Sequence, residues 1–493
     1  MADSPDSKQW TTIDKDLSKI SQVEYATAYI SRPLVAPGIA LAFMVMAGLA
    51  AALLFGATPV NLVVIAAAVI GAYMAINIGA NDVANNMGPA VGANALSMGG
   101  AIAIAAIFES AGALVAGGDV VSTISKGIID PTSVAETRAF IWAMMAALLS
   151  AALWINLATW VGAPVSTTHS VVGGVMGAGI AAAGMGAVNW PTMGAIAASW
   201  VISPVLGGVI AAAFLALIKS RILYQEDKIA AARRWVPILV AIMAGAFAAY
   251  LALKGLKKVL PITMQGALLI GFSLGLLTFV VTRPLIARKS RGMENRNKSV
   301  KVLFSIPLVL SAALLSFAHG ANDVANAVGP LAAIVHASDM GSAADQVAIP
   351  VWVMVIGAFG ISFGLFLFGP KLIRMVGGQI TKLNPMRAYC VALSAAFTVI
   401  VASWLGLPVS STHIAVGAVF GVGFFREWHM ERRRRKLNNT RPDTTRIASE
   451  ERLRRKLVRR SHFLTIVAAW VITVPAAALM SGAIFTMLNS LTH

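Results

Sequence analysis

Residues 79–89 of the chain read GANDVANNMGP, and residues 320–330 read GANDVANAVGP. The second copy begins 241 residues after the first. Each copy follows a long apolar run and combines one acid, at least two amides, helix-breaking glycines and a proline. Because polar groups at membrane depth are costly, such a segment persists mainly where it lines a cavity or binds a ligand. The repeat therefore predicts a buried polar site built from two copies of one unit.

A second motif is duplicated as well, since residues 164–169 read PVSTTH and residues 408–413 read PVSSTH. It follows the first motif by 83 residues in one half and 86 in the other, counted from the first asparagine of one motif to the proline of the other. Two paired motifs at matched spacing indicate a duplicated chain.

The composition places the chain in a membrane. Of its 493 residues, 58% are hydrophobic and only 12% are charged, about half the charge usual in a soluble protein. Several apolar runs reach the roughly 20 residues that span a bilayer as a helix. The single cysteine, Cys390, excludes an internal disulfide framework. We therefore predict an all-α polytopic membrane protein.

The apolar runs predict about 12–13 transmembrane helices. Segments 79–96 and 321–336 are too polar and too rich in glycine and proline for plain spans, so we expect broken or re-entrant helices there. The predicted spans are 35–56, 60–78, 100–118, 137–161, 166–186, 192–218, 235–254, 262–282, 302–320, 349–369, 388–406, 409–424 and 463–487.

Charge placement predicts the orientation. Loops 219–234, 284–301, 370–387 and 425–462 hold 29 of the 39 Lys and Arg residues, whereas the alternate loops 119–136 and 337–348 hold one Lys and five acidic residues between them. One alternate loop is an exception, because it carries Lys254, Lys257 and Lys258. Basic loops favour the cytoplasmic side, which makes the two halves inverted copies in the cell (inner) membrane. Inverted repeats with broken helices are a recurring plan of secondary transporters. We place the basic runs of 425–462 at lipid headgroups and expect no nucleic-acid role.

This pattern predicts six regions along the chain. The first span, 35–56, is expected to correspond to 262–282, which leaves 235–254 as an extra linker helix. The regions are a polar N-terminal tail (1–33), the first inverted repeat (34–218), a basic linker with its linker helix (219–261), the second inverted repeat (262–424), a basic cytoplasmic loop (425–462) and a final transmembrane helix (463–493).

Acids and amides at membrane depth predict a site for a coupling cation. An unpaired carboxylate there must bind a cation or take up a proton. The alternative for Asp82 and Asp323 is a helix-capping role. Glu109 lies in an apolar span, and its repeat counterpart falls near Gly360 or Ile361, so this acid is not duplicated. The candidate cation-binding residues are Asn81, Asp82, Asn85, Glu109, Asn322, Asp323 and Asn326.

The second motif predicts an anion site. Its proline favours a first helical turn, and the free N–H groups that follow attract an anion together with the helix dipole. Three consecutive hydroxyl side chains add donors, although a plain Ser/Thr cap is the alternative. The carboxylates repel the anion until cations bind, and bound cations would raise the affinity for the anion. This mutual dependence is the coupling that symport requires. His169 and His413 close the motifs and are interpreted as structural, and His319 receives less weight because Ile78 replaces it in the first copy.

At these residues the chain resembles the PiT family of inorganic phosphate transporters. The likeness rests on both GANDVAN elements, both PVS-S/T-TH elements, the run Ile107-Phe108-Glu109 and KGIID at 126–130. It implies phosphate uptake driven by Na⁺ or H⁺, with phosphate in some members carried as a neutral metal complex. The phosphate-binding residues that it implies are Asp82, Ser166, Thr167, Thr168, Asp323, Ser410, Ser411 and Thr412.

The predicted function is therefore a secondary active symporter for inorganic phosphate in a lipid bilayer. A sulfate permease on the same scaffold and an uncoupled anion exchanger or channel are the alternatives. We expect no enzymatic activity, because mirror-related catalytic sets are not expected in an inverted repeat. No cofactor is expected beyond the coupling ion, and no metal beyond Na⁺. A homodimer is left open.

Overall fold

A computed structural model describes most of the chain. The described residues are 34–56, 61–134, 136–161, 165–256, 260–340, 349–379, 383–440 and 460–491. The predicted tail 1–33 and the middle of the basic loop 425–462 lie outside them. Within the described residues the fold is helical apart from one isolated β-bridge between Ile129 and Val188.

The helices follow the predicted spans closely. The first is the helix Leu34–Phe55. The others are α2 (Asn61–Asn81), α3 (Val83–Gly92), α4 (Met98–Ala116), α5 (Gly118–Ser122), α6 (Thr137–Val161), α7 (Thr167–Ala183), α8 (Trp190–Ile218), α9 (Lys228–Lys254), α10 (Met264–Lys289), α11 (Asn297–Leu303), α12 (Ser305–Met340), α13 (Val351–Gln379), α14 (Pro385–Trp404), α15 (Ser411–Thr440) and α17 (Arg460–Ser490).

Local sequence explains where several helices begin. The side chains of Ser97, Asn189, Asp227, Thr263 and Asn384 each accept a backbone N–H bond from the first turn of the helix that follows. Such caps satisfy donors that have no partner within the helix. The helix starts are therefore determined locally, whereas apolar burial determines how the helices pack.

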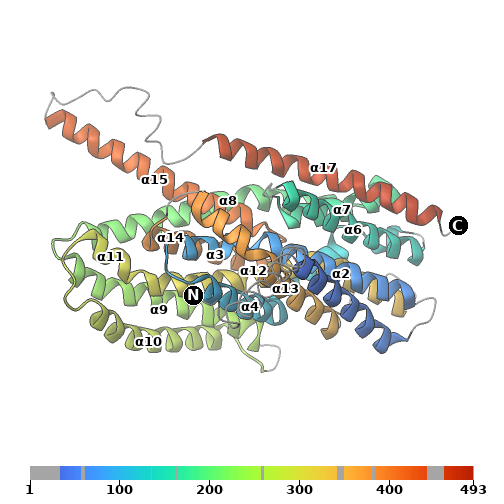
Figure 1. The fold of residues 1–493 in the computed structure, drawn as a ribbon, viewed down its shortest axis with the longest axis horizontal. Coiled ribbons are helices and arrows are strands. Elements are labelled where there is room, and N and C mark those ends of the chain that lie inside the picture. Colours follow the sequence, from blue (N-terminus) through green and yellow to red (C-terminus); the bar gives the residue numbers. More distant parts are fainter. Residues whose placement is uncertain are drawn as a thin grey trace, which may run out of the picture.

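The two halves interlock. Helix α2 packs on α13 and α4 packs on α12, so each half contributes one helix to each pair. In the same way α7 packs on α17 and α15 packs on α8. Figure 1 shows α15 and α17 along one edge of the bundle and α10 along the opposite edge. The final helix α17 is therefore the counterpart, in the second half, of α8 in the first half.

Glycines set the register of this interlocking. A Cβ added to Gly79 would lie 1.9 Å from the Ile361 carbonyl oxygen, and one added to Gly320 would lie 2.1 Å from that of Glu109. Only glycine permits such an approach between backbones. The matched contacts make Glu109 and Ile361 equivalent positions. The Ser110 and Ser362 hydroxyls next to them hydrogen-bond each other at 2.9 Å, where the two halves meet.

Eleven of the described helices are long and apolar enough to cross a membrane. The other two predicted spans, 166–186 and 409–424, are α7 and the start of α15, the helices that follow the hydroxyl motifs. Helix α7 has only 17 residues, about 25 Å of length against the ~30 Å of a bilayer core. The fold is therefore the predicted all-helical membrane bundle, with two helices that begin inside it.

The two predicted helix breaks differ. In the first half the chain turns at Asp82, between α2 and α3. In the second half the prediction for 321–336 is wrong, because α12 runs unbroken for 36 residues with Pro330 inside it. This helix is the most deeply buried of the candidate spans, and packing of such a helix outweighs the one hydrogen bond that proline removes.

The first span and α9 each pack on one of the long central helices. Phe43 of the helix Leu34–Phe55 packs on Phe363 of α13, with 4.9 Å between ring centroids. Phe247 of α9 contacts Phe317 of α12 edge-on, also at 4.9 Å. Helix α10, which contains the segment 262–282, packs mainly on α9. The match of the first span to 262–282 and the domain boundaries stay predictions.

Candidate functional site

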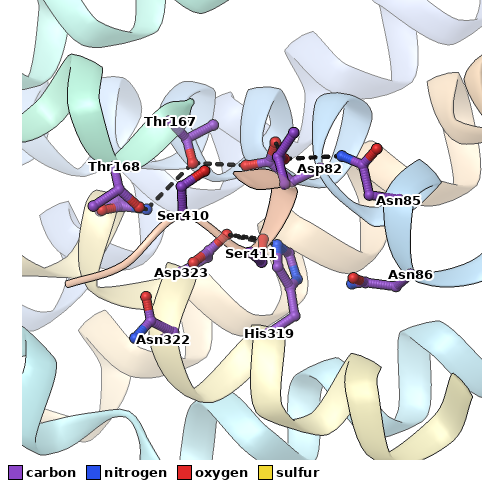
Figure 2. Close-up of polar contacts among 12 residues, drawn as sticks. Asp82, Asn85, Asn86, Thr167, Thr168, His319, Asn322, Asp323, Ser410 and Ser411 are labelled. Atoms are coloured by element: carbon purple, nitrogen blue, oxygen red, sulfur yellow. Dashed lines mark hydrogen bonds and ion pairs between the residues drawn. The ribbon is translucent and has the colours of Figure 1, made fainter. Parts of the chain in front are cut away.

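The two repeated acids meet in the middle of the bundle. Asp82 lies at the turn between α2 and α3, and Asp323 lies in the middle of α12. Both side chains are only 1% exposed. Ligand atoms of Asp82, Asp323 and His319 lie within 4.8 Å of one another. Figure 2 shows these side chains converging between the two hydroxyl motifs.

Both hydroxyl motifs open a helix at this point. The Ser166 side chain accepts the His169 N–H at 3.2 Å, and the Ser410 side chain accepts the His413 N–H at 3.3 Å. Both serines are therefore N-caps, as the structural alternative for these motifs predicted. Their part in phosphate binding stays a prediction. Because α7 and α15 begin beside the carboxylates, the positive ends of both helix dipoles point into the site.

The Asp82 carboxylate accepts a hydroxyl from each motif. Thr167 donates to Oδ2 at 2.6 Å, and Thr412 of the other half donates to Oδ1 at 3.2 Å. Asn85 in turn donates its amide to the Thr412 hydroxyl at 2.9 Å. One carboxylate thus joins the starts of α7 and α15.

The environment of Asp323 mirrors this arrangement. Ser411, the counterpart of Thr167, donates to its Oδ2 at 3.1 Å. The Asn326 amide reaches the hydroxyls of Thr167 and Thr168 at 3.3 and 3.2 Å, as Asn85 reaches Thr412. Each half therefore supplies donors to the other. The duplicated motifs form one shared site with approximate twofold symmetry, and the dashed contacts of Figure 2 trace it.

Two of the amides predicted to bind a cation form hydrogen bonds with neighbouring helices instead. Asn81 donates to the Thr159 hydroxyl of α6 at 2.8 Å, and its counterpart Asn322 donates to the Ser403 hydroxyl of α14 at 3.0 Å. Asn322 also accepts the Val409 N–H at 3.2 Å and so holds the segment that leads into α15. In the structure these amides fix neighbouring helices, and cation binding by them stays a prediction.

Glu109 joins the site through a histidine. Its Oε1 accepts the Asn86 amide at 3.0 Å, and its Oε2 lies 3.0 Å from His319 Nδ1. The other ring nitrogen, His319 Nε2, lies 2.7 Å from Asp323 Oδ2. His319 is fully buried between two acids, so it links the unduplicated acid to a duplicated one.

The importance of His319 was underestimated from the sequence, although a signal was available. His319 precedes Asp323 by four residues, a spacing that places two side chains on one helix face. The role of Asn86 was also missed, even though it belongs to the first motif. Neither residue has a repeat counterpart of the same type, so the duplication gives no indication of their roles.

The motif histidines lie on the far side of the motif helices. The His169 and His413 rings meet edge-on with 4.5 Å between centroids, and Trp200 of α8 packs on His169 at 3.8 Å. Both imidazoles are at least 96% buried. This aromatic contact joins the first turns of α7 and α15, which agrees with the structural role expected for these residues.

The donor set suits a cation and an oxyanion together. Carboxylate, amide and hydroxyl oxygens are the ligands that hard cations such as Na⁺ prefer. Hydroxyl and helix N-terminal donors suit an anion. No described Lys or Arg contributes a hydrogen bond or ion pair to these carboxylates. The negative charge of the site therefore calls for cations or protons.

The interlocked halves and the polar site that they share in the middle of the bundle define a class of protein, the membrane transporter built from inverted repeats. The family model described as "Phosphate transporter family" matches residues 78–481. Because this match covers most of the chain, the chain belongs to the phosphate transporter family.

Several known proteins are similar along nearly their whole length. A Helicobacter pylori (strain J99) protein named "Putative phosphate permease" is 47% identical, and the alignment covers 96% of this chain and 99% of that protein. A Pyrococcus abyssi protein with a similar name is 36% identical, with 85% and 96% covered. A solved structure named "The sodium-dependent phosphate transporter" aligns with a TM-score of 0.78 at 36% identity, covering 87% of this chain and 99% of that one.

Proposed function

We propose that the protein is a secondary symporter that moves inorganic phosphate together with cations. The observation that carries this proposal is the pairing of hydroxyl donors with carboxylates in the shared site. The hydroxyl groups of Thr167, Thr412 and Ser411 all donate hydrogen bonds to Asp82 or Asp323. Those same hydroxyls, at the starts of α7 and α15, are the donors that an anion needs.

This pairing supplies a coupling mechanism. A cation that binds between the carboxylates takes over the neutralisation of their charge, so the hydroxyl groups can rotate away. They then donate to phosphate, which also meets the N–H groups of two helix starts. Without the cation, phosphate would be repelled by two carboxylates, and the hydroxyl donors would remain hydrogen-bonded to those carboxylates. Each ligand therefore raises the affinity for the other, and this mutual coupling is reciprocal by linkage.

Phosphate is favoured over sulfate by the carboxylates themselves. At neutral pH phosphate carries a proton that can donate to a carboxylate, whereas sulfate has none. Asp82 and Asp323 lie beside the proposed anion position and can accept that proton. A phosphate–metal complex is an alternative form of the substrate, which added Mg²⁺ would reveal. Family membership and the names of the relatives support phosphate as the transported anion.

Na⁺ is our first choice of cation, and a proton is the alternative. The oxygen ligands suit Na⁺, and the solved relative is named as sodium-dependent. We further propose that the basic loops face the cytoplasm, as their excess of Lys and Arg indicates, which sets the direction of uptake.

The experiment is uptake of radiolabelled phosphate into proteoliposomes that contain the purified protein. A Na⁺ gradient and a pH gradient are imposed separately, with sulfate as competitor. We expect uptake to follow the Na⁺ gradient and to ignore sulfate. Uptake that follows pH alone would assign the proton, and uptake indifferent to both gradients would refute symport.

A further inference from the structure

A large apolar groove runs along the outer edge of the bundle, behind the motif helices. It has a volume of about 1050 Å³, at the upper end of the range for small-molecule pockets. Helices α7, α8, α15 and α17 contribute its lining, and none of its lining residues carries a carboxylate, ammonium or guanidinium group. Figure 1 shows α15 and α17 along this same edge of the bundle. The groove is thus separate from the carboxylate site.

The deep end of the groove touches the hydroxyl motifs. Its lining includes His169, His413 and Trp200, the aromatic cluster that joins the first turns of α7 and α15. The Trp200 indole N–H donates to the Pro408 carbonyl at 3.0 Å, so this end offers an apolar wall. From His413 to Trp428 along α15 the groove extends about 22 Å, more than the ~15 Å of one bilayer leaflet. The groove therefore has the length of a lipid acyl chain.

Basic residues gather at the other end. The Lys219 ammonium lies 5.0 Å from the ring of Phe425, and the Arg432 guanidinium lies 5.3 Å from the ring of Trp428. Both rings line the groove. Cations within about 6 Å of an aromatic ring are attracted to its face. The mouth of the groove therefore carries positive charge directly above its apolar walls.

Two more cations strengthen this charge. Arg387, at the start of α14, and Arg426 of α15 both act electrostatically on Lys219. All three side chains are half-buried, and among the described residues none of them forms an ion pair with a carboxylate. Glu427 offsets part of the charge of Arg426. A net positive cluster of half-buried side chains next to an apolar surface attracts an anion.

We propose that the groove binds one phospholipid with an anionic headgroup, one of its acyl chains along α15 and its phosphate at Lys219, Arg387 and Arg426. Two observations favour this occupant. The groove is lined by apolar side chains apart from His169 and His413 at one end, and the cations lie at the other end, where basic loops predict the headgroup level of the cytoplasmic leaflet. A soluble phosphate compound would use the cations and leave the groove empty.

The test is native mass spectrometry of the purified full chain, released from detergent with phosphatidylglycerol or phosphatidylcholine added. We expect one phosphatidylglycerol to stay bound per chain, and phosphatidylcholine to be retained far less. The double substitution Lys219→Gln and Arg426→Gln is expected to weaken phosphatidylglycerol retention about thirtyfold, since each basic residue near an anionic surface contributes roughly a fivefold preference. The matched control is Arg288→Gln with Lys289→Gln on α10, which should retain the lipid as the unaltered chain does.

A second pair of variants tests the groove without changing charge. Val205 of α8 lines the groove and is 62% exposed, and Val280 of α10 is 59% exposed on the opposite edge. Val205→Trp fills the groove and is expected to abolish lipid retention, whereas Val280→Trp is expected to leave it unchanged. Both positions face outward, so neither substitution presses on a buried backbone.

Four results would overturn the proposal. Equal retention of both lipids, or equal effects of the groove variants and their controls, would mean ordinary annular lipid. Displacement of the lipid by inorganic phosphate at low millimolar concentration would assign the cations to a soluble anion. Lipid-free dimers of the unaltered chain that Val205→Trp converts to monomers would make a second copy the occupant. None of these outcomes requires transport, so they are independent of the proposed symport.

Discussion

Replacing Thr167 with valine isolates the hydroxyl group on which the proposed coupling depends. The Thr167 hydroxyl donates to Asp82 Oδ2 at 2.6 Å and accepts the Asn326 amide at 3.3 Å. The side chain is 1% exposed, and valine has nearly the same shape. The substitution therefore removes a donor and an acceptor from the site while leaving the packing of α7 in place.

The loss of phosphate affinity in Thr167→Val is expected to depend on whether cations are bound. With cations bound, the hydroxyl is expected to donate to phosphate, and a hydrogen bond to a charged group is worth about 1.5–3 kcal/mol. Its loss should raise the phosphate concentration for half-maximal uptake by roughly 10- to 150-fold, since 1.4 kcal/mol is a factor of ten. Without cations the same hydroxyl is already held by Asp82, so phosphate loses less. Thr167→Val should consequently reduce the cation-dependent gain in phosphate affinity.

The assay measures phosphate binding by titration calorimetry at high and at zero Na⁺, and uptake in proteoliposomes. Thr398→Val on α14 is the matched control, because Thr398 is also buried but, among the residues that the structure describes, donates only to the Ser394 carbonyl of its own helix, at 2.8 Å. We expect the control to keep its phosphate affinity within about twofold, since that carbonyl retains its helical bond. An equal loss of affinity at high and zero Na⁺ in Thr167→Val would refute the exchange of hydroxyl partners.

Two further predictions concern the acids and the glycines. Asp82→Asn or Asp323→Asn should lower coupled uptake about a hundredfold or more, because a cation-binding charge and bonds worth ~1.5–3 kcal/mol each are lost; near-normal uptake by membrane-inserted protein would exclude the cation role. Gly320→Ala, whose Cβ would lie 2.1 Å from a carbonyl oxygen, should lower the apparent unfolding temperature by the equivalent of about 1–3 kcal/mol or more, whereas Gly194→Ala on α8, with nothing within 4 Å, should raise it slightly.

The duplication made most of the site predictable. Equal spacing of the two motifs in each half implied one shared polar centre, and Asp82, Asp323, Thr167 and Ser411 do meet there. What the sequence could not supply was the crossing of partners between halves, such as Thr412 with Asp82. Those contacts depend on how two copies of one helical unit pack, and residue spacing along one copy carries no information on that.

The one clear error, the break expected at 321–336, has a physical origin. That break followed from local helix propensity, which deep burial of α12 overrides. Propensity is a property of a single segment, whereas tertiary packing decides whether the helix continues through it.

The departures from symmetry lead to a last prediction. The equivalents of Glu109 and His319 in the other half are Ile361 and Ile78, both buried, so isoleucine is accommodated at these places. Glu109 and His319 are partners, with 3.0 Å between Oε2 and Nδ1. Removing one member of such a buried pair leaves the other uncompensated, at about 3–5 kcal/mol, whereas replacing both by apolar residues is far milder.

Glu109→Ile and His319→Ile should therefore each lower the apparent unfolding temperature strongly. The double variant should lose less than the sum of the two, by about 0.5–3 kcal/mol of coupling. Relief stays partial, because Asp323 then keeps only Ser411 among the donors described for its Oδ2. Uptake should remain absent in the double variant if the histidine link serves transport. Additive losses of stability would show that the pair is not energetically coupled, and recovery of uptake with stability would assign the pair to folding alone.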